Sequence, residues 1–279
     1  MEGLAWPEND FADWIGFTET ASEVLTSSLV ERFLAVVPGQ SQEPELPLGL
    51  HWCLAPIAEP AEGLGPDGHP RVGLHLPPIP LPRRMWAGGR LVFHDGLRIG
   101  DEVRRVSSVE SITRKTGRTG QLVFVTVQHE IHTGRGLAID EFQDLVYREP
   151  PDRERQKPAE AATTPAAGEA RQRIVTDPVL LFRYSAITFN GHRIHYDHPY
   201  ATQVEDYPGL VVHGPLMATL LANLARRELG SLSRFSFRGQ SPLICGETLE
   251  LHAAPGENGL ALEARSGTDG RIVMTAEAA

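Results

Sequence analysis

Residues 207–225 read YPGLVVHGPLMATLLANLA, an apolar segment that passes directly into a helical pattern. Pro215 favours the first turn of a helix, and the leucines after it recur at helical spacing. A helix is therefore predicted from about Pro215 to Leu229. Because the first amides of a helix have no partner within it, we expect the Gly214 N–H to lie free at the positive end of the helix dipole.

A second segment, FNGHRIHYD at residues 189–197, lies just upstream of this helix. Side chains five residues apart point in different directions on a regular helix or strand, so Asn190 and His195 converge only on an irregular segment. Gly191 and Pro199 favour such a loop. Histidine, with an ordinary pKa of about 6.5, is a suitable general base near neutral pH, and an asparagine amide can orient a water molecule. The segment is therefore a candidate catalytic site.

The chain divides into two halves of similar pattern. Residues 149–173 combine proline, alanine and charge without periodic apolar residues, which predicts an exposed linker between an N-terminal unit, 1–148, and a C-terminal unit, 174–279. In each unit a helix is expected to precede antiparallel strands. Thr20 and Glu23 fit a capping box at the start of the N-terminal helix.

Strand patterns dominate the rest of both halves. They occur at residues 90–95, 102–117, 121–133 and 137–149, then at 178–187, 234–239, 247–255, 260–266 and 271–278. The predicted fold is α+β: two antiparallel sheets, each wrapped around a long helix, that pair across a shared edge within one chain.

Composition limits the partners and the compartment. The chain has 279 residues and a net charge of −10, which disfavours nucleic acid and anionic membrane surfaces. No apolar run approaches the ~18 residues that span a bilayer, and the acidic start does not fit a targeting peptide. Cys53 and Cys245 are far apart, which predicts reduced thiols and a cytoplasmic protein.

The two C-terminal segments carry a family resemblance. FRYSAITFNGHRIHYDHPYA (182–201) and YPGLVVHGPLMA (207–218) resemble the hydratase motif of the MaoC-like double hot-dog enoyl-thioester hydratases and dehydratases. The resemblance implies a double hot-dog fold, His195 as the catalytic histidine, and His213 and Gly214 at the start of the following helix. Asn190 stands where the family usually has aspartate.

The N-terminal half resembles one subgroup of that family. LGPDGHP (64–70) and LPPIPLPRRMWAGGR (76–90) are similar to mesaconyl-C4-CoA and itaconyl-CoA hydratases, which implies reversible hydration of such an acyl-CoA to citramalyl-CoA. No cofactor is implied besides the coenzyme A of the substrate, no metal is implied, and a homo-oligomer is allowed. The alternatives are an (R)-3-hydroxyacyl-thioester dehydratase of fatty-acid synthesis, which shares the NGHRIHYD variant, and a non-catalytic acyl-CoA-binding hot-dog protein.

The motif suggests how the reaction proceeds. His195 would take a proton from a water held by Asn190, and the Gly214 N–H would bind the oxyanion of the thioester. Because Asn190 cannot titrate, one imidazole is expected to act as both base and acid, which predicts syn addition.

Several basic residues are candidates for substrate binding. The adjacent Arg83 and Arg84 are expected to meet the coenzyme A phosphates. A substrate carboxylate would need a cation, for which Arg84, Arg90 and Arg193 are candidates. His213 is a candidate for contact with the substrate, and Arg238 is a weaker one.

Other histidines have alternative roles. His192, His195, Asp197 and His198 could form a metal site, but Gly191 and Pro199 argue against the regular helix that such spacing needs. His129 and His132 lie three apart on a predicted strand, face opposite ways and are interpreted as structural.

Overall fold

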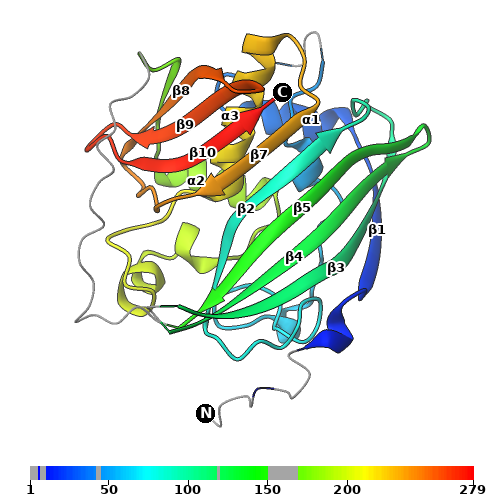
Figure 1. Ribbon diagram of the computed structural model, residues 1–279, viewed down its shortest axis with the longest axis vertical. Coiled ribbons are helices and arrows are strands. Elements are labelled where there is room, and N and C mark those ends of the chain that lie inside the picture. Colours follow the sequence, from blue (N-terminus) through cyan, green and yellow to red (C-terminus); the bar gives the residue numbers. More distant parts are fainter. Residues whose placement is uncertain (1–5, 7–10, 42–44, 118–119, 150–168) are drawn as a thin grey trace.

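The strands of the chain form one continuous antiparallel sheet in the order β1-β3-β4-β5-β2-β7-β10-β9-β8-β6 (Figure 1). The computed structural model describes residues 6, 11–41, 45–117, 120–149 and 169–279. The strands are β1 (Thr18–Val24), β2 (Arg83–Phe93), β3 (Glu102–Gly117), β4 (Gly120–Thr133), β5 (Gly136–Arg148), β6 (Gln172–Val175), β7 (Arg234–Gly239), β8 (Thr248–Gly256), β9 (Gly259–Ser266) and β10 (Ile272–Ala278).

The two halves of the chain meet at a single strand pair. Along the sheet, β1 to β5 form one half of the strand order and β6 to β10 form the other. At the middle, β2 pairs antiparallel with β7, so that Gly88 is opposite Arg238 and Leu91 is opposite Phe235. The predicted pairing of the two units across a shared edge is confirmed. Most of the predicted linker lies outside the described residues, and its last two residues, Gln172 and Arg173, begin β6.

Three α-helices lie behind the sheet in the view of Figure 1. They are α1 (Ser27–Val36), α2 (Pro178–Ile187) and α3 (Gly214–Leu229), and the short helical turns are η1 (Ala12–Trp14), η2 (Leu50–Cys53), η3 (Ala61–Gly63), η4 (Arg193–His195) and η5 (Tyr200–Val204). Helix α3 is buried from Leu216 to Ala225, as expected of a helix that is apolar on nearly all sides. It ends at Gly230, whose φ of 82° is typical of a left-handed helix cap. None of the helices among the described residues is long and apolar enough to cross a membrane.

Two secondary-structure predictions are wrong. Thr20 and Glu23 lie in β1, which pairs with β3, and α1 begins after Thr26, whose side chain accepts a hydrogen bond from the Leu29 N–H at 3.2 Å. Residues 178–187, predicted as a strand, form α2. Asp177 caps this helix by accepting from the Leu180 N–H at 2.7 Å, and Pro178 occupies its first turn. These capping residues override the strand preference of the apolar run.

One side chain of α3 also ties the helix to the N-terminal half. Asn223 is buried, its Oδ1 accepts from the Leu48 N–H at 2.9 Å, and its Nδ2 donates to the Leu48 carbonyl at 2.9 Å. Because both bonds go to the backbone of one distant residue, they fix the 46–48 segment against α3.

We expect Asn223→Ala to lower the free energy of unfolding by about 2 kcal/mol, because the partner groups on Leu48 lose their hydrogen bonds. Denaturant unfolding would measure the change. Glu228→Ala, on the exposed end of the same helix, should alter the stability by less than about 0.5 kcal/mol. Equal losses in the two variants would show that the contact to Leu48 contributes nothing special.

Candidate active site

A cavity of about 650 Å³ lies between the two halves of the chain. The N-terminal half contributes residues of β2 to β5 and of the loop around His69, and the C-terminal half contributes the loop after α2 and the start of α3. Asn190, His195 and Gly214, the three predicted catalytic residues, all line it. Three residues from a loop, a short helical turn and a helix start therefore face one cavity.

The loop after α2 is irregular, as predicted. Phe189 has a positive φ of 52°, and the N–H of Asn190 donates to the Ser185 carbonyl at 2.8 Å, which closes the end of α2. The Oδ1 of Asn190 accepts from the N–H of His192 at 2.9 Å. Because this oxygen holds the loop in shape, the amide NH₂ of Asn190 is the group that remains to meet a water or a substrate oxygen.

His195 is held as a neutral base. Its side chain is buried, and Nδ1 lies 2.7 Å from the Val211 carbonyl, an acceptor that requires Nδ1 to carry the proton. Nε2 is then the unprotonated nitrogen. Burial lowers the pKa of His195 to about 4, and the bond to Val211 opposes the shift. The ring is therefore uncharged near neutral pH and can accept a proton.

His213 packs behind His195 and does not reach the cavity. Its ring stacks on that of His195 with centroids 3.7 Å apart, and its Nε2 lies 2.8 Å from the Ser185 hydroxyl. The side chain is fully buried and is not part of the cavity wall. The predicted contact with substrate is therefore wrong, because the helix start points this ring into the core, where it supports His195.

The N–H of Gly214 is positioned by Trp86 of β2. Gly214 is the first residue of α3, and its N–H has no hydrogen-bond partner in the described part of the chain. A Cβ at this position would lie 2.7 Å from Cε3 of Trp86, so the indole packs directly against the glycine backbone. Trp86 in turn stacks on Phe237 of β7 at 4.5 Å between centroids. The free amide thus faces the cavity at a helix N-terminus, where negative charge is stabilised.

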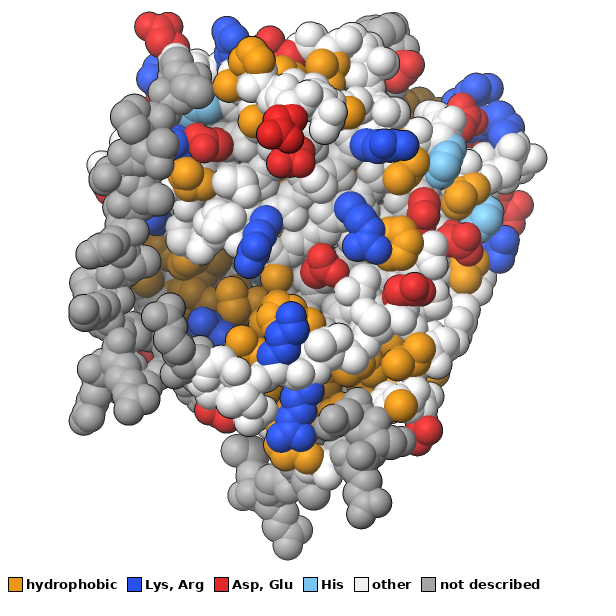
Figure 2. Space-filling view, viewed as in Figure 1, with side chains coloured by type: hydrophobic (Ala, Val, Ile, Leu, Met, Phe, Trp, Pro, Cys, Tyr) orange, Lys and Arg blue, Asp and Glu red, His pale blue; other side chains and the backbone are white. Residues whose placement is uncertain are grey.

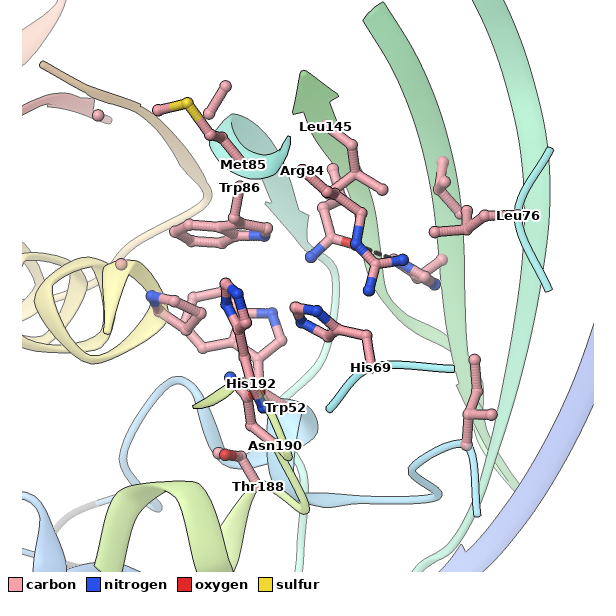
Figure 3. Close-up of a pocket in the computed structure, with 18 of the residues that line it drawn as sticks. Trp52, His69, Leu76, Arg84, Met85, Trp86, Leu145, Thr188, Asn190 and His192 are labelled. Atoms are coloured by element: carbon pink, nitrogen blue, oxygen red, sulfur yellow. Dashed lines mark hydrogen bonds between the residues drawn. The ribbon is translucent and has the colours of Figure 1, made fainter. Parts of the chain in front are cut away.

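A second imidazole reaches the cavity from the N-terminal half. His69 lies in the loop before β2, and its Nδ1 is 2.9 Å from Oδ2 of Asp67. Its ring packs against that of His192 with centroids 4.2 Å apart, and the His192 ring lies 5.4 Å from that of His195. Figure 3 shows His69 and His192 facing one another below Trp86 and Arg84. The sequence indicates this loop only through its family resemblance, and the local signal for the pair is the Asp-Gly-His spacing of residues 67–69.

The predicted arginines separate into different environments. Arg84 lines the cavity, whereas Arg83, its neighbour on β2, is buried and bound to Glu205, with Nε 3.2 Å from Oε2. The expectation that Arg83 meets coenzyme A is therefore wrong, because alternate side chains of a strand face opposite ways.

The other three arginines do not line the cavity either. Arg90 is exposed, with its guanidinium 3.9 Å from the centre of the Phe142 ring, and Arg193 pairs with Asp197 at 2.7 Å. Neither can bind a carboxylate deep in the cavity. Arg238 is exposed on β7 beside Gly239, which lines the cavity, so its contact with coenzyme A stays a prediction. Figure 2 shows basic side chains scattered among acidic ones over the visible face of the molecule, without a single basic patch.

The N-terminal part of the cavity holds several polar side chains among apolar ones. Glu141 is buried, accepts from the Trp52 indole N–H at 2.9 Å and lies 3.3 Å from Nε2 of His51. Burial opposes the charged form of Glu141, but the hydrogen bond and charge of His51 lower its pKa overall. Arg105 and His129 also line this part. The interpretation of His129 as merely structural is therefore incomplete.

The described residues also bear on metal binding. Asp67, His69 and His192 offer ligand atoms within 4.8 Å of one another. We do not assign a metal to them, since Asp67 and His69 already bond to each other and the positive charge of Arg84 acts on both. In the alternative group that the sequence suggested, Asp197 pairs with Arg193, and His198 is exposed outside the cavity.

Comparison with known proteins places this site in a family. The family model described as "Hydroxyacyl-thioester dehydratase type 2" matches residues 49–245. This range includes the loop around His69, the catalytic loop at residues 188–197 and the start of α3. The chain belongs to this family. It is therefore a hydro-lyase, an enzyme that adds or removes water at an acyl thioester, and the non-catalytic alternative is excluded.

Individual relatives agree with this family. The chain is 43% identical over 272 residues to the mesaconyl-C(4)-CoA hydratase of Chloroflexus aurantiacus, covering 96% of each protein. Its fold is similar to that of HtdX from Mycobacterium tuberculosis, with a TM-score of 0.66, 19% identity and coverage of 93% of this chain and 97% of HtdX. A second M. tuberculosis protein, described as having a double hot-dog fold, matches with a TM-score of 0.56, 16% identity and 95% coverage of both chains. The double hot-dog prediction is confirmed.

Gly214→Ala tests the packing of the helix start. The added Cβ would lie 2.7 Å from Trp86, so the indole or the helix start must move, and we expect kcat/KM for the enoyl-CoA substrate to fall about 100-fold. Gly134→Ala, where a Cβ meets nothing within 4 Å, is the matched control and should leave the rate unchanged. Full activity of Gly214→Ala, with native circular dichroism, would contradict the assigned role.

Proposed function

We propose that the chain reversibly hydrates a short α,β-unsaturated acyl-CoA that carries a free carboxyl group, mesaconyl-C4-CoA or itaconyl-CoA, to citramalyl-CoA. The observation that carries the proposal is that the bare Nε2 of His195 and the free N–H of Gly214 belong to one cavity wall. A base and an oxyanion donor on one cavity are the two groups that hydration of an enoyl thioester needs. The 43% identity to a mesaconyl-C(4)-CoA hydratase supports the substrate class.

The reaction would begin with a water molecule near Asn190. Nε2 of His195 takes a proton from the water as its oxygen bonds to Cβ. The electron pair of the double bond moves toward the thioester, and the resulting negative charge on the thioester oxygen is stabilised by the Gly214 N–H at the start of α3. Protonation of Cα completes the addition.

The charged groups among the apolar residues of the lining favour a short acyl group with a carboxylate over a fatty acyl chain. An alkyl chain in the cavity would place apolar carbons against the guanidinium of Arg84 and remove water from it without a compensating partner. An acyl group with its own carboxylate meets a cation instead, because Arg84 projects into the cavity close enough to affect the pKa of His69. The dehydratase of fatty-acid synthesis is the second candidate, and the family description is the observation that favours it.

The free state of the two cysteine thiols supports a cytoplasmic location. Both Cys53 and Cys245 are free, and burial raises the pKa of Cys53 to about 12, which keeps this thiol protonated and unreactive. We propose a cytoplasmic enzyme on this ground, with coenzyme A present only as part of the substrate.

An activity panel tests the function. Mesaconyl-C4-CoA and itaconyl-CoA should be hydrated with a kcat/KM at least about 100-fold above those of crotonyl-CoA and a long-chain enoyl thioester.

His195→Gln should lower the rate by about 10³-fold while circular dichroism stays native. In the wild type, kcat/KM should be lost as the pH falls through about 4, because protonation of His195 removes the base. Preference for the long-chain thioester would replace this proposal with the fatty-acid dehydratase.

Arg84→Gln should separate the substrates. Loss of a charge-assisted hydrogen bond to the substrate carboxylate costs about 1.5–3 kcal/mol, so kcat/KM for mesaconyl-C4-CoA should fall about 10- to 100-fold. The value for crotonyl-CoA, which has no carboxylate, should change less than about threefold. Arg90→Gln is the control, because Arg90 lies outside the cavity wall. Equal losses for both substrates would assign Arg84 to a part of the thioester that the two share.

A further inference from the structure

The active site contains a second imidazole that the single-histidine scheme does not use. His69 lines the same cavity as His195, and Asp67 lies behind it, with Oδ2 2.9 Å from Nδ1. Asp67 also accepts from the backbone N–H of His69 at 3.1 Å. With Nδ1 directed at the carboxylate, Nε2 is the nitrogen left to exchange a proton with a bound molecule.

The loop that carries this pair is fixed to the catalytic loop. The N–H of Arg193 donates to the Asp67 carbonyl at 2.9 Å, and its guanidinium donates to the Pro66 carbonyl at 2.9 Å. The two backbones touch at glycines: a Cβ on Gly68 would lie 2.0 Å from the Gly191 carbonyl oxygen, and one on Gly191 would lie 2.5 Å from that of Gly68. This close approach places His69 beside His192 and sets the Asp67–His69 pair within the site.

We propose that His69, oriented by Asp67, is the second proton-transfer residue of the hydration and delivers the proton to Cα. This inference rests on the proposed function. His195 takes one proton from water as the C–O bond forms, and Nε2–H of the His69 imidazolium gives its proton to Cα as the enolate collapses. One water is added in total. The cycle closes when the proton on His195 moves to His69 by way of His192, whose ring lies between theirs.

The environments of the two rings assign the roles. Burial favours the uncharged form of His195, and the hydrogen bond to the Val211 carbonyl opposes this only in part, whereas Asp67 provides a negative charge beside the ring of His69. When the surroundings of two titratable groups push their pKa values apart, one group commonly acts as the acid and the other as the base. About a quarter of the His69 and Asp67 side chains stays exposed, 23% and 27%, so this pair can also exchange protons with solvent.

The charged and titratable groups that act on His69 come from three segments. Burial, and then Arg84 of β2, lower the pKa of His69 below its ordinary value, and Asp67 of its own loop opposes this shift in part. His192 of the catalytic loop contacts the ring, and His195 interacts with it over a longer distance. Removal of Asp67 therefore leaves the effects that lower the pKa of His69 unopposed.

Exchange at Cα of a saturated acyl-CoA separates the two imidazoles. Butyryl-CoA and methylsuccinyl-CoA have no double bond or hydroxyl, so solvent deuterium enters Cα only through the residue that serves Cα. We expect His195→Gln to keep this exchange within about threefold of wild type and His69→Gln to lose about 100-fold or more, measured by mass spectrometry. The opposite result, exchange lost in His195→Gln and kept in His69→Gln, would restore the single-imidazole scheme and overturn the proposal.

A second variant guards against a folding defect in His69→Gln. In Asp67→Asn, the alkaline limb of kcat/KM for hydration should move to lower pH, because the protonated His69 loses the group that favours it. The acid limb, set by His195, should stay near pH 4. Asp269→Asn, an exposed carboxylate outside the cavity wall, is the matched control and should shift neither limb. An unchanged alkaline limb in Asp67→Asn would contradict the proposal.

Two controls separate a failure of this proposal from a failure of the proposed function and from metal binding. If the wild type hydrates a different enoyl-CoA from the one proposed, the exchange test still reports on His69, since its substrates are saturated. All assays are run with and without a chelator: equal rates support proton transfer, and loss of exchange with the chelator would assign Asp67, His69 and His192 to a metal instead.

Discussion

The antiparallel pairing of β2 with β7 is the contact on which the active site depends. It makes one sheet from two halves and brings β2 against the start of α3, where Trp86 packs on Gly214 and Phe237. Neither half holds a complete site. The C-terminal half carries His195 and the Gly214 N–H, for which we propose the roles of base and oxyanion donor, and the N-terminal half carries Arg84 and His69. Under the proposed roles, catalysis requires the pairing of β2 with β7 to be intact.

The C-terminal half of the site could be predicted because its signals are local. A glycine and a proline within a few residues of Asn190 and His195 predict an irregular loop, and Pro215 predicts the helix start that frees the Gly214 N–H. Strands β3 and β7 were predicted at their observed bounds for a related reason, because a content of β-branched and aromatic residues that favours a strand is itself a property of the segment.

The remaining features depend on tertiary contacts that no local pattern contains. On β2, Arg83 turns toward Glu205 and Arg84 toward the cavity, and the sequence RR does not say which face is which. The stacking of His213 behind His195 depends on how α3 enters the core. Residues 178–187 form a helix because the capping Asp177 outweighs a strand-like run of apolar residues.

The absence of an aspartate at position 190 changes the charge balance of the site. In a buried group of imidazoles, burial disfavours a charge on each ring and the neighbouring rings add to the effect, as the lowered pKa of His192 shows. A proton taken from water must still reside somewhere during turnover. Asn190 cannot compensate it, and the carbonyl at Val211 carries no net charge. Under the proposed mechanism, Asp67 provides the compensating negative charge from the other half of the chain and so takes the place of the carboxylate that the motif lacks.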